Sequence, residues 1–460
     1  MVSAWHAHAL TYPNPLRVIY FFMKDDRKSI FGWCMYDWAN SAYITTVGVA
    51  LLPIYFREGI VPAEGVALFG QTFSATALWG FMVGGAALLV FLFAPVLGAI
   101  ADFSSAKKRL LIGFAYSGSL FSTLLFLCSP GDVWLAVALY ISTQVCFIGG
   151  NVFYDAFLPQ IASEDKLDTV SARGYAFGYI GGSLQFGISL ALVAMHESIG
   201  ISQVMAIRIA MAMAGFWWAG WTVLTLIYLK EDRTEQALPE IYRHRPKFFA
   251  YLSLGINRTI ATAKKVGHFK HLSLFVIAYM VYNDGAHTVT SMATIYGSEE
   301  LGLSATSLMV TLLLVQVVAI GGALLFGKLA TRIGAKRAVM VSLVLWTGVV
   351  IYGYFVQTAT EFFALGMVVG IVLGGIQALS RSFYGAMIPE NASAEFYGFF
   401  SVFSKFSAIW GPFTFGFVKQ ITGTARLAII SLIVFFIVGF ILLAFVNEEK
   451  AKADRDKFAF

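Results

Sequence analysis

The first long apolar run of this chain opens on the segment Gly32-Trp33-Cys34-Met35-Tyr36-Asp37-Trp38-Ala39-Asn40-Ser41-Ala42-Tyr43. Between Lys28 and Arg57 the one charged residue is Asp37. A charged side chain at the centre of a bilayer costs roughly 2.5–3.5 kcal/mol on insertion scales, so this carboxylate needs a water-filled space, a partner or a proton. The segment therefore predicts a membrane-spanning helix that carries one carboxylate in a special setting.

The composition is typical of a membrane protein with many spans. Of the 460 residues, 58% are hydrophobic and 13% are charged, whereas about 25% of the residues in a soluble domain are charged. The net charge of +6 does not indicate nucleic-acid binding, because the basic residues lie in loops between apolar runs. Twelve runs have the length of about 20 residues that crosses a bilayer as a helix: 31–55, 78–101, 109–128, 133–153, 174–196, 203–229, 271–295, 305–330, 337–357, 361–383, 396–418 and 425–446.

The spacing of the runs divides the chain into two related halves. The segment 151–159 resembles 381–389, which indicates an internal repeat of six spans. We therefore expect an all-α membrane protein with twelve transmembrane helices in two pseudo-symmetric six-helix bundles. The expected parts are a cytoplasmic N-terminal segment (1–30, not a signal peptide), the first bundle (31–229), a cytoplasmic linker (230–270), the second bundle (271–446) and a cytoplasmic tail (447–460).

Basic residues indicate the orientation. With twelve spans, the connecting segments alternate between the two sides of the membrane. All but five of the 32 Lys and Arg residues fall on the same side as the N-terminus. The positive-inside rule then places both termini and the linker in the cytoplasm. We expect the plasma (inner) membrane, or a vacuolar or other endomembrane in a eukaryote, and a monomer in the lipid bilayer.

The first candidate site is the opening segment. At helical spacing Tyr36, Asn40 and Tyr43 share one face, with Asp37 and Ser41 beside it. This face could bind substrate or a proton in a central cavity. Equally, Asp37 could be a structural carboxylate that caps another helix or bonds a lysine.

The second candidate lies in the seventh run, where Asp284 is the one full charge between Lys270 and Glu299. His287 follows one turn later. A buried carboxylate and an imidazole at this spacing can carry a proton near neutral pH. The alternative is an Asp–His pair that holds helices together, and mid-span position favours the functional interpretation.

Two further groups lie near the cytoplasmic ends of spans. Asp102, Lys108 and Arg109 follow the second span and are interpreted as a conformational latch. Gln377 and Arg381 in the tenth span, with Asp155 in the fourth, are interpreted as substrate-binding or gating residues, or as plain interface anchors.

No catalytic constellation accompanies these groups. The chain has no phosphate-binding loop motif of an ATPase, and we expect no enzyme activity, no cofactor and no metal site. The run Gly174-Tyr-Ala-Phe-Gly178-Tyr-Ile-Gly181-Gly182 lies inside an apolar segment, so close helix packing explains its glycines better than a nucleotide loop does.

Several of these stretches resemble a known family. The turn Gly98…Asp102…Lys107-Lys108-Arg109 is similar to the loop signature of the major facilitator superfamily. The more specific segments resemble the vacuole effluxer-like family within it, which is related to the autophagy amino-acid effluxers of fungal vacuoles: Tyr36–Tyr43, Phe153–Pro159, Ser171–Gly174, Tyr282–Gly285 and Gly375–Ser382.

The resemblance implies the major facilitator fold, a cavity lined mainly by spans one, four, seven and ten, alternating access, and export of amino acids or similar solutes. We therefore expect a secondary active transporter of a small polar solute, coupled to protons. Asp37 and Asp284 would carry the charge, and His287, Asn40, Tyr43, Gln377 and Arg381 would help to bind solute. The alternatives are a passive uniporter and a membrane sensor or scaffold that transports nothing.

Overall fold

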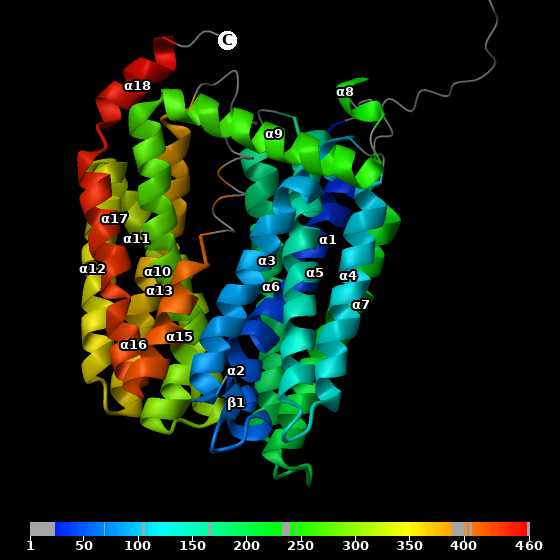
Figure 1. Ribbon diagram of the computed structural model, residues 1–460, viewed down its shortest axis with the longest axis vertical. Helices are drawn as coiled ribbons and strands as arrows, with labels where there is room; N and C mark the ends of the chain where they lie inside the picture. Colours follow the sequence, from blue (N-terminus) through cyan, green and yellow to red (C-terminus); the bar gives the residue numbers. More distant parts are fainter. Residues whose placement is uncertain are drawn as a thin grey trace, which may run out of the picture.

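The computed structural model describes residues 24–68, 70–103, 106–163, 167–231, 240–244, 246–388, 400, 403 and 407–457. Most of the expected N-terminal segment, part of the linker and most of residues 389–406 therefore lie outside the described residues. The described chain is almost entirely helical, and two groups of long helices stand side by side (Figure 1).

The helices of the first bundle pack mainly on one another. They are α1 (Arg27–Ala42) continued by η1 (Tyr43–Leu51), α2 (Leu52–Tyr55) and η2 (Phe56–Ile60), then α3 (Ala75–Phe103), α4 (Lys107–Leu124) with η3 (Leu125–Leu127), α5 (Val133–Ile161), α6 (Leu167–Ala194) and α7 (Gln203–Tyr228). A short antiparallel hairpin, β1 (Val66–Leu68) and β2 (Gln71–Phe73), joins the first span to α3. The sequence analysis did not predict this hairpin.

The second bundle follows a linker that contains two helices, α8 (Glu240–Arg243) and α9 (Lys247–His268). Its helices are α10 (Lys270–Leu301), α11 (Ala305–Ile333), α12 (Ala335–Phe355), α13 (Ala359–Gly385), α15 (Trp410–Thr422), α16 (Ala425–Ser431) and α17 (Ile433–Phe445), followed by α18 (Glu448–Lys457). Helices α9 and α18 lie at one end of the molecule, which we call the linker end, and the β-hairpin lies at the other, the hairpin end (Figure 1).

Nine of the described helices are long and apolar enough to cross a membrane. The other three expected spans correspond to α3, α10 and α15. In α3 the apolar part, Ala75–Val90, is shorter than a full span. Helix α10 carries the polar group around Asp284. Helix α15 is the described half of the span expected at 396–418. The twelve expected spans are consistent with this arrangement.

The regular α-helix of the first span is interrupted before Pro53, and a residue of the other bundle hydrogen-bonds to the interrupted backbone. Pro53 has no N–H, so it cannot donate to the carbonyl of Val49 four residues earlier. The backbone before it winds as a π-helix over η1, a conformation often found at functional sites. The freed carbonyl oxygen of Val49 accepts a hydrogen bond of 2.6 Å from Thr294 Oγ1 on α10. A side chain of the opposite bundle thus supplies the hydrogen-bond partner for this backbone carbonyl within the membrane.

Polar contacts close the two bundles together at the hairpin end. Arg57 Nη1 donates to Ser298 Oγ at 2.6 Å, and the Ser298 hydroxyl donates to Glu58. Thr76 on α3 donates to Glu299, which also pairs with the buried Lys419 of α15. These contacts join the end of the first span and the start of α3 to the end of α10.

Close packing of α3 on α15 completes this closure. A Cβ added to Gly80 would lie 2.8 Å from the carbonyl oxygen of Pro412 and 2.9 Å from the Cα of Gly416. The two backbones therefore approach as closely as glycine allows, and any side chain at position 80 would push the bundles apart.

We predict that Gly80→Val lowers the free energy of unfolding by about 1–3 kcal/mol, because overpacking at a tight contact forces backbone shifts. Gly85 lies on the same helix and has no atom within 4 Å of an added Cβ, so Gly85→Val is the matched control. Thermal unfolding of the purified variants measures the difference. Equal melting temperatures for the two variants would contradict the close contact.

Candidate functional site

The segment Tyr282-Asn283-Asp284-Gly285 of α10 is a junction between helices of the second bundle. Tyr282 Oη and Ser380 Oγ of α13 lie 2.6 Å apart and share a hydrogen bond. Asn283 Nδ2 donates to Ser407 Oγ at 2.5 Å. Gly285 leaves room for Phe435 and Phe436 of α17, since an added Cβ would lie 2.9 Å from the Cβ of Phe435. Each residue of the segment thus serves packing or hydrogen bonding.

Asp284 caps a helix in the middle of the bundle. Its two carboxylate oxygens accept hydrogen bonds of 2.9 Å from the backbone N–H groups of Trp410 and Gly411, which begin α15. The side chain is 3% exposed. An anion at a helix N-terminus satisfies unpaired N–H groups and interacts favourably with the helix dipole. Gly411 is required for this approach, because a Cβ there would lie 2.0 Å from Thr288 Oγ1.

We predict that Asp284→Ala lowers the free energy of unfolding by roughly 0.5–2 kcal/mol, the usual cost of losing a helix cap. Asp284→Asn keeps one acceptor oxygen and is expected to cost clearly less. Thermal unfolding in detergent compares the two variants with the native protein. Similar losses in both variants would mean that the charge, and not the hydrogen bonds, holds α15.

The neighbouring candidate residues face different surroundings. His287 is exposed on α10, although it follows Asp284 by one turn. In the first bundle, Asn40 is buried and its Nδ2 donates to Asn151 Oδ1 of α5 at 2.8 Å. Tyr43 is fully buried and stacks on Trp218 of α7. The face with Asn40 and Tyr43 therefore turns into the first bundle rather than toward the second.

Asp37 lies on the other side of α1, against α6. A Cβ added to Gly178 would lie 2.8 Å from Ser41 Oγ and 2.9 Å from Asp37 Cγ. A Cβ on Gly181 would meet the carbonyl oxygen of Trp38 at 2.5 Å. The prediction that these glycines serve helix packing is therefore confirmed. Because α6 approaches so closely, Asp37 is held partly buried beside the tyrosines of that helix.

Charged residues of both bundles lie around Tyr175. This α6 side chain is 57% exposed, and its hydroxyl lies within electrostatic reach of Asp37 on α1, Asp155 on α5 and Arg381 on α13. Tyr179, one turn further along α6, also lies within reach of Asp37. Gln377 is exposed on α13, one turn from Arg381. The structure thus brings three of the predicted site residues together and adds two tyrosines that the sequence analysis did not single out.

The predicted latch is described in part. Lys107 begins α4, and its backbone N–H and that of Lys108 interact with the carboxyl group of Glu231, just after α7. Arg109 is exposed. The backbone of Asp102 lies in α3, and its side chain lies outside the described part of the chain. Glu231 interacts with the start of α4, and its position after the sixth span did not reveal this contact.

Burial raises the pKa of Glu231 above its ordinary value of 4.5, although hydrogen bonds from Lys108 and Lys107 lower it. Between pH 4.5 and the raised pKa, Glu231 keeps its proton in the folded protein and releases it in the unfolded chain. We predict that stability rises as the pH falls from above the raised pKa to 4.5. Melting temperatures of the native protein and of Glu231→Gln are compared over this pH range. As the pH falls, the melting temperature of the native protein is expected to rise relative to that of the variant. The same pH dependence in both proteins would contradict the assignment.

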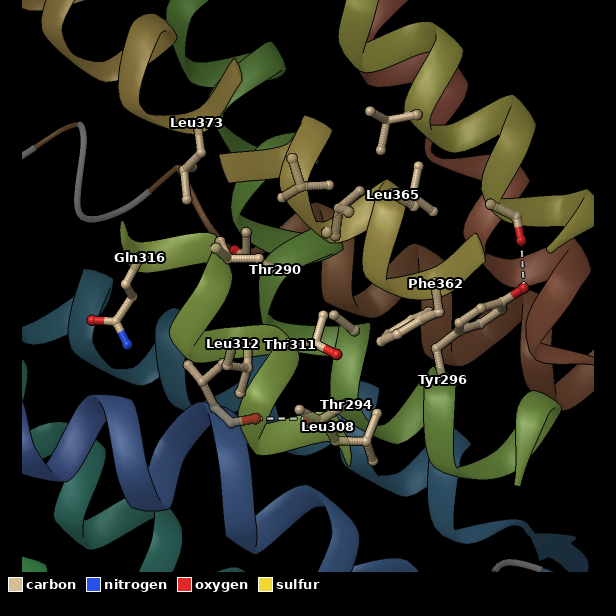
Figure 2. A pocket seen from close by; sticks show the side chains of 18 of the residues that line it. Thr290, Thr294, Tyr296, Leu308, Thr311, Leu312, Gln316, Phe362, Leu365 and Leu373 are labelled. Carbon is tan, nitrogen blue, oxygen red and sulfur yellow. Dashed lines mark hydrogen bonds between the residues drawn. The ribbon is translucent and has the colours of Figure 1, made fainter. Parts of the chain in front are cut away.

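An apolar cavity of about 260 Å³ lies between η1 and the second bundle. Its threonine and tyrosine hydroxyls donate to backbone carbonyls: Thr290 to His287, Thr294 to Val49 and Tyr296 to Gly353. Figure 2 shows the amide of Gln316 at one edge of the lining, which is otherwise apolar apart from these hydroxyl-bearing side chains. None of the predicted site residues lines this cavity. The walls of the cavity suit a hydrocarbon group. The charged residues Asp37, Asp155 and Arg381 lie instead around Tyr175.

Comparison with known proteins identifies the family that the sequence motifs resemble. The model of the family described as "Vacuole effluxer Atg22 like" matches residues 25–456, almost the whole chain. The chain belongs to the vacuole effluxer Atg22-like family.

Relatives of this Atg22-like protein are found in bacteria and fungi. It is 35% identical to "Uncharacterized MFS-type transporter YxiO" of Bacillus subtilis, over 93% of this chain and 96% of the relative. It is 26% identical to autophagy-related protein 22-1 of Neosartorya fischeri, over 64% of this chain and 50% of that protein's length. The name of the Bacillus subtilis relative, an MFS-type transporter, indicates a membrane transporter.

A solved structure shows the fold. A bacterial homologue of the human lysosomal transporter Spinster, in an inward-facing and unoccupied conformation, matches with a TM-score of 0.67 and 12% identity over 93% of this chain and 98% of that chain. The predicted major facilitator fold of two six-helix bundles is thereby confirmed. The Atg22-like protein is an integral membrane transporter of the major facilitator type.

Proposed function

We propose that this protein is a proton-coupled secondary active transporter that moves a small zwitterionic solute, such as an amino acid, by alternating access. The observation that carries the proposal is the meeting of opposite charges around Tyr175. A carboxylate of the solute would pair with the guanidinium of Arg381, which suits planar bidentate recognition. Its ammonium group would pair with Asp37 or Asp155.

The position of these charges on two bundles suits a transport cycle. Asp37 and Asp155 belong to the first bundle and Arg381 belongs to the second. A solute that bridges them favours one relative position of the bundles, and a ligand shifts a conformational equilibrium by its difference in affinity for the two states. The polar contacts at the hairpin end would break when that end opens.

Asp37 is the carboxylate that we propose for proton coupling. It is partly buried beside Tyr179, and protonation would remove the charge that attracts the ammonium group of the solute. His287, exposed on α10, is proposed as a second titrating group. Asp284 is occupied by two backbone N–H groups, so we propose that it shapes the site and carries no proton in the cycle.

The bias of basic residues supports an orientation with the linker end in the cytoplasm. The hairpin end would then face the outside, or the lumen of an organelle. Solute released from the cytoplasm would pass the contacts of Arg57, Glu58 and Ser298 last.

The test begins with a thermal-shift screen of the purified protein against amino acids, peptides, sugars and organic acids, because a bound solute stabilises the folded state by mass action. Proteoliposomes with an imposed pH gradient then measure accumulation of the solute that binds. We predict that Asp37→Asn abolishes accumulation driven by the gradient and weakens binding of the solute, because the amide lacks the charge that attracts the ammonium group. Asp284→Asn, the matched carboxylate variant in the second bundle, is expected to keep both.

Other outcomes would overturn parts of the proposal. Accumulation by Asp37→Asn at the native level would exclude Asp37 as the coupling group. Equilibration of the native protein without accumulation, at any pH gradient, would show a passive uniporter. A screen without any stabilising solute, together with a cellular phenotype that survives Arg381→Ala, would favour the sensor or scaffold.

A further inference from the structure

Helix α9 of the linker crosses the linker end of both bundles (Figure 1). It packs on α3 of the first bundle and contacts α10 of the second. Only Phe269 separates its last residue from Lys270, where α10 begins. Since α10 enters the membrane there, α9 lies at the level where the spans leave the bilayer, and it runs across them rather than along them.

The faces of α9 differ in their surroundings. Ala250 and Leu254 are 1% and 4% exposed, on the side packed against the protein. Phe249, Ile256 and Ile260 are 57%, 42% and 47% exposed. Their spacing of seven and four residues places them on one line along the helix. We call these three residues the apolar stripe.

The charges of α9 all have one sign. The sequence Lys247–His268 contains Lys247, Arg258, Lys264 and Lys265 and no Asp or Glu. Lys264 is exposed. A helix with an exposed apolar stripe and only basic charges is typical of helices that lie in a membrane interface with anionic lipids. An acidic protein partner would match the charges, but it would not explain an apolar stripe at the level of the bilayer surface.

We propose that α9 is a lipid-binding helix: the apolar stripe enters the leaflet at the linker end, and the basic residues bind anionic phospholipid headgroups. The binding site is distinct from the residues around Tyr175. Because α9 touches one bundle and leads directly into the other, bound anionic lipid acts on the relative position of the bundles. The stability of the protein therefore depends on the headgroup charge of the surrounding lipid.

Fluorescent labelling of the full chain in lipid nanodiscs tests the position of the stripe. The native cysteines Cys34, Cys128 and Cys146 are all buried, so a cysteine introduced at an exposed position is labelled selectively, with the unmodified protein as the blank. Ile256→Cys and Ile260→Cys carry the label on the stripe, and Lys450→Cys on α18, an exposed position at the same end of the molecule, carries it as the control. Quenchers attached to lipid chains and quenchers dissolved in water are compared.

We expect the labels at positions 256 and 260 to be quenched by the lipid-attached quencher and the label at 450 by the aqueous one. Quenching of all three labels from water would overturn the proposal. Protection of positions 256 and 260 from both quenchers would also overturn it, because the stripe would then be covered by protein.

A second measurement tests the charge. Melting temperatures are compared in nanodiscs of neutral phosphatidylcholine and of phosphatidylcholine mixed with phosphatidylglycerol. We expect the anionic lipid to raise the melting temperature of the native protein, and Lys264→Glu to reduce this rise. The control is Lys450→Glu on α18, an exposed lysine at the same end. Equal effects of the two substitutions, or no effect of phosphatidylglycerol on the native protein, would refute a specific site on α9. Neither measurement requires the transported solute.

Discussion

Within a bilayer every backbone N–H and C=O group must find a partner inside the protein, and two irregular spans of this protein show how that constraint is met. Pro53 frees the carbonyl of Val49 in the first span, and Thr294 of α10 donates to it. The described helix of the eleventh span begins at Trp410, and Asp284 of α10 accepts its first N–H groups. Helix α10 therefore pairs the backbone of one irregular span in each bundle. Its polar residues, which lower its apolar character as a span, are the residues that make these irregularities stable.

Besides the close contact of Gly80 with α15, the two bundles are joined at one end by hydrogen bonds between side chains, which the glycine contacts inside each bundle lack. Inside a bundle, glycines bring helices together, as Gly178 does for α6 and α1. Between the bundles, polar and charged side chains such as Arg57, Glu58 and Ser298 contribute hydrogen bonds. Hydrogen bonds of this type exchange readily with water. This difference suits two bundles that keep their own packing while they move relative to each other.

The charges that support the proposed transport function lie away from the apolar cavity beside η1. Tyr175 is close to two carboxylates of one bundle and to Arg381 of the other, whereas the cavity presents hydroxyls that are already bonded to the backbone. The structure thus separates a polar region that can recognise charge from an apolar region that cannot. Helix α9 adds a third surface, which packs on α3 of one bundle and contacts α10 of the other.

From the amino-acid sequence alone we could predict the membrane class, most of the spans, the two-bundle fold and the family, because these follow from the length of apolar runs and from local motifs. It also placed Asp37, Asp155 and Arg381 among the candidate residues. Only the tertiary structure decided that Asn40 and Tyr43 face α5 and α7, that Asp284 caps α15, and that Tyr175 lies where the charges meet. Spacing along one helix fixes the angle between its side chains, but the neighbour that packs against each face is set by contacts between residues far apart in the chain.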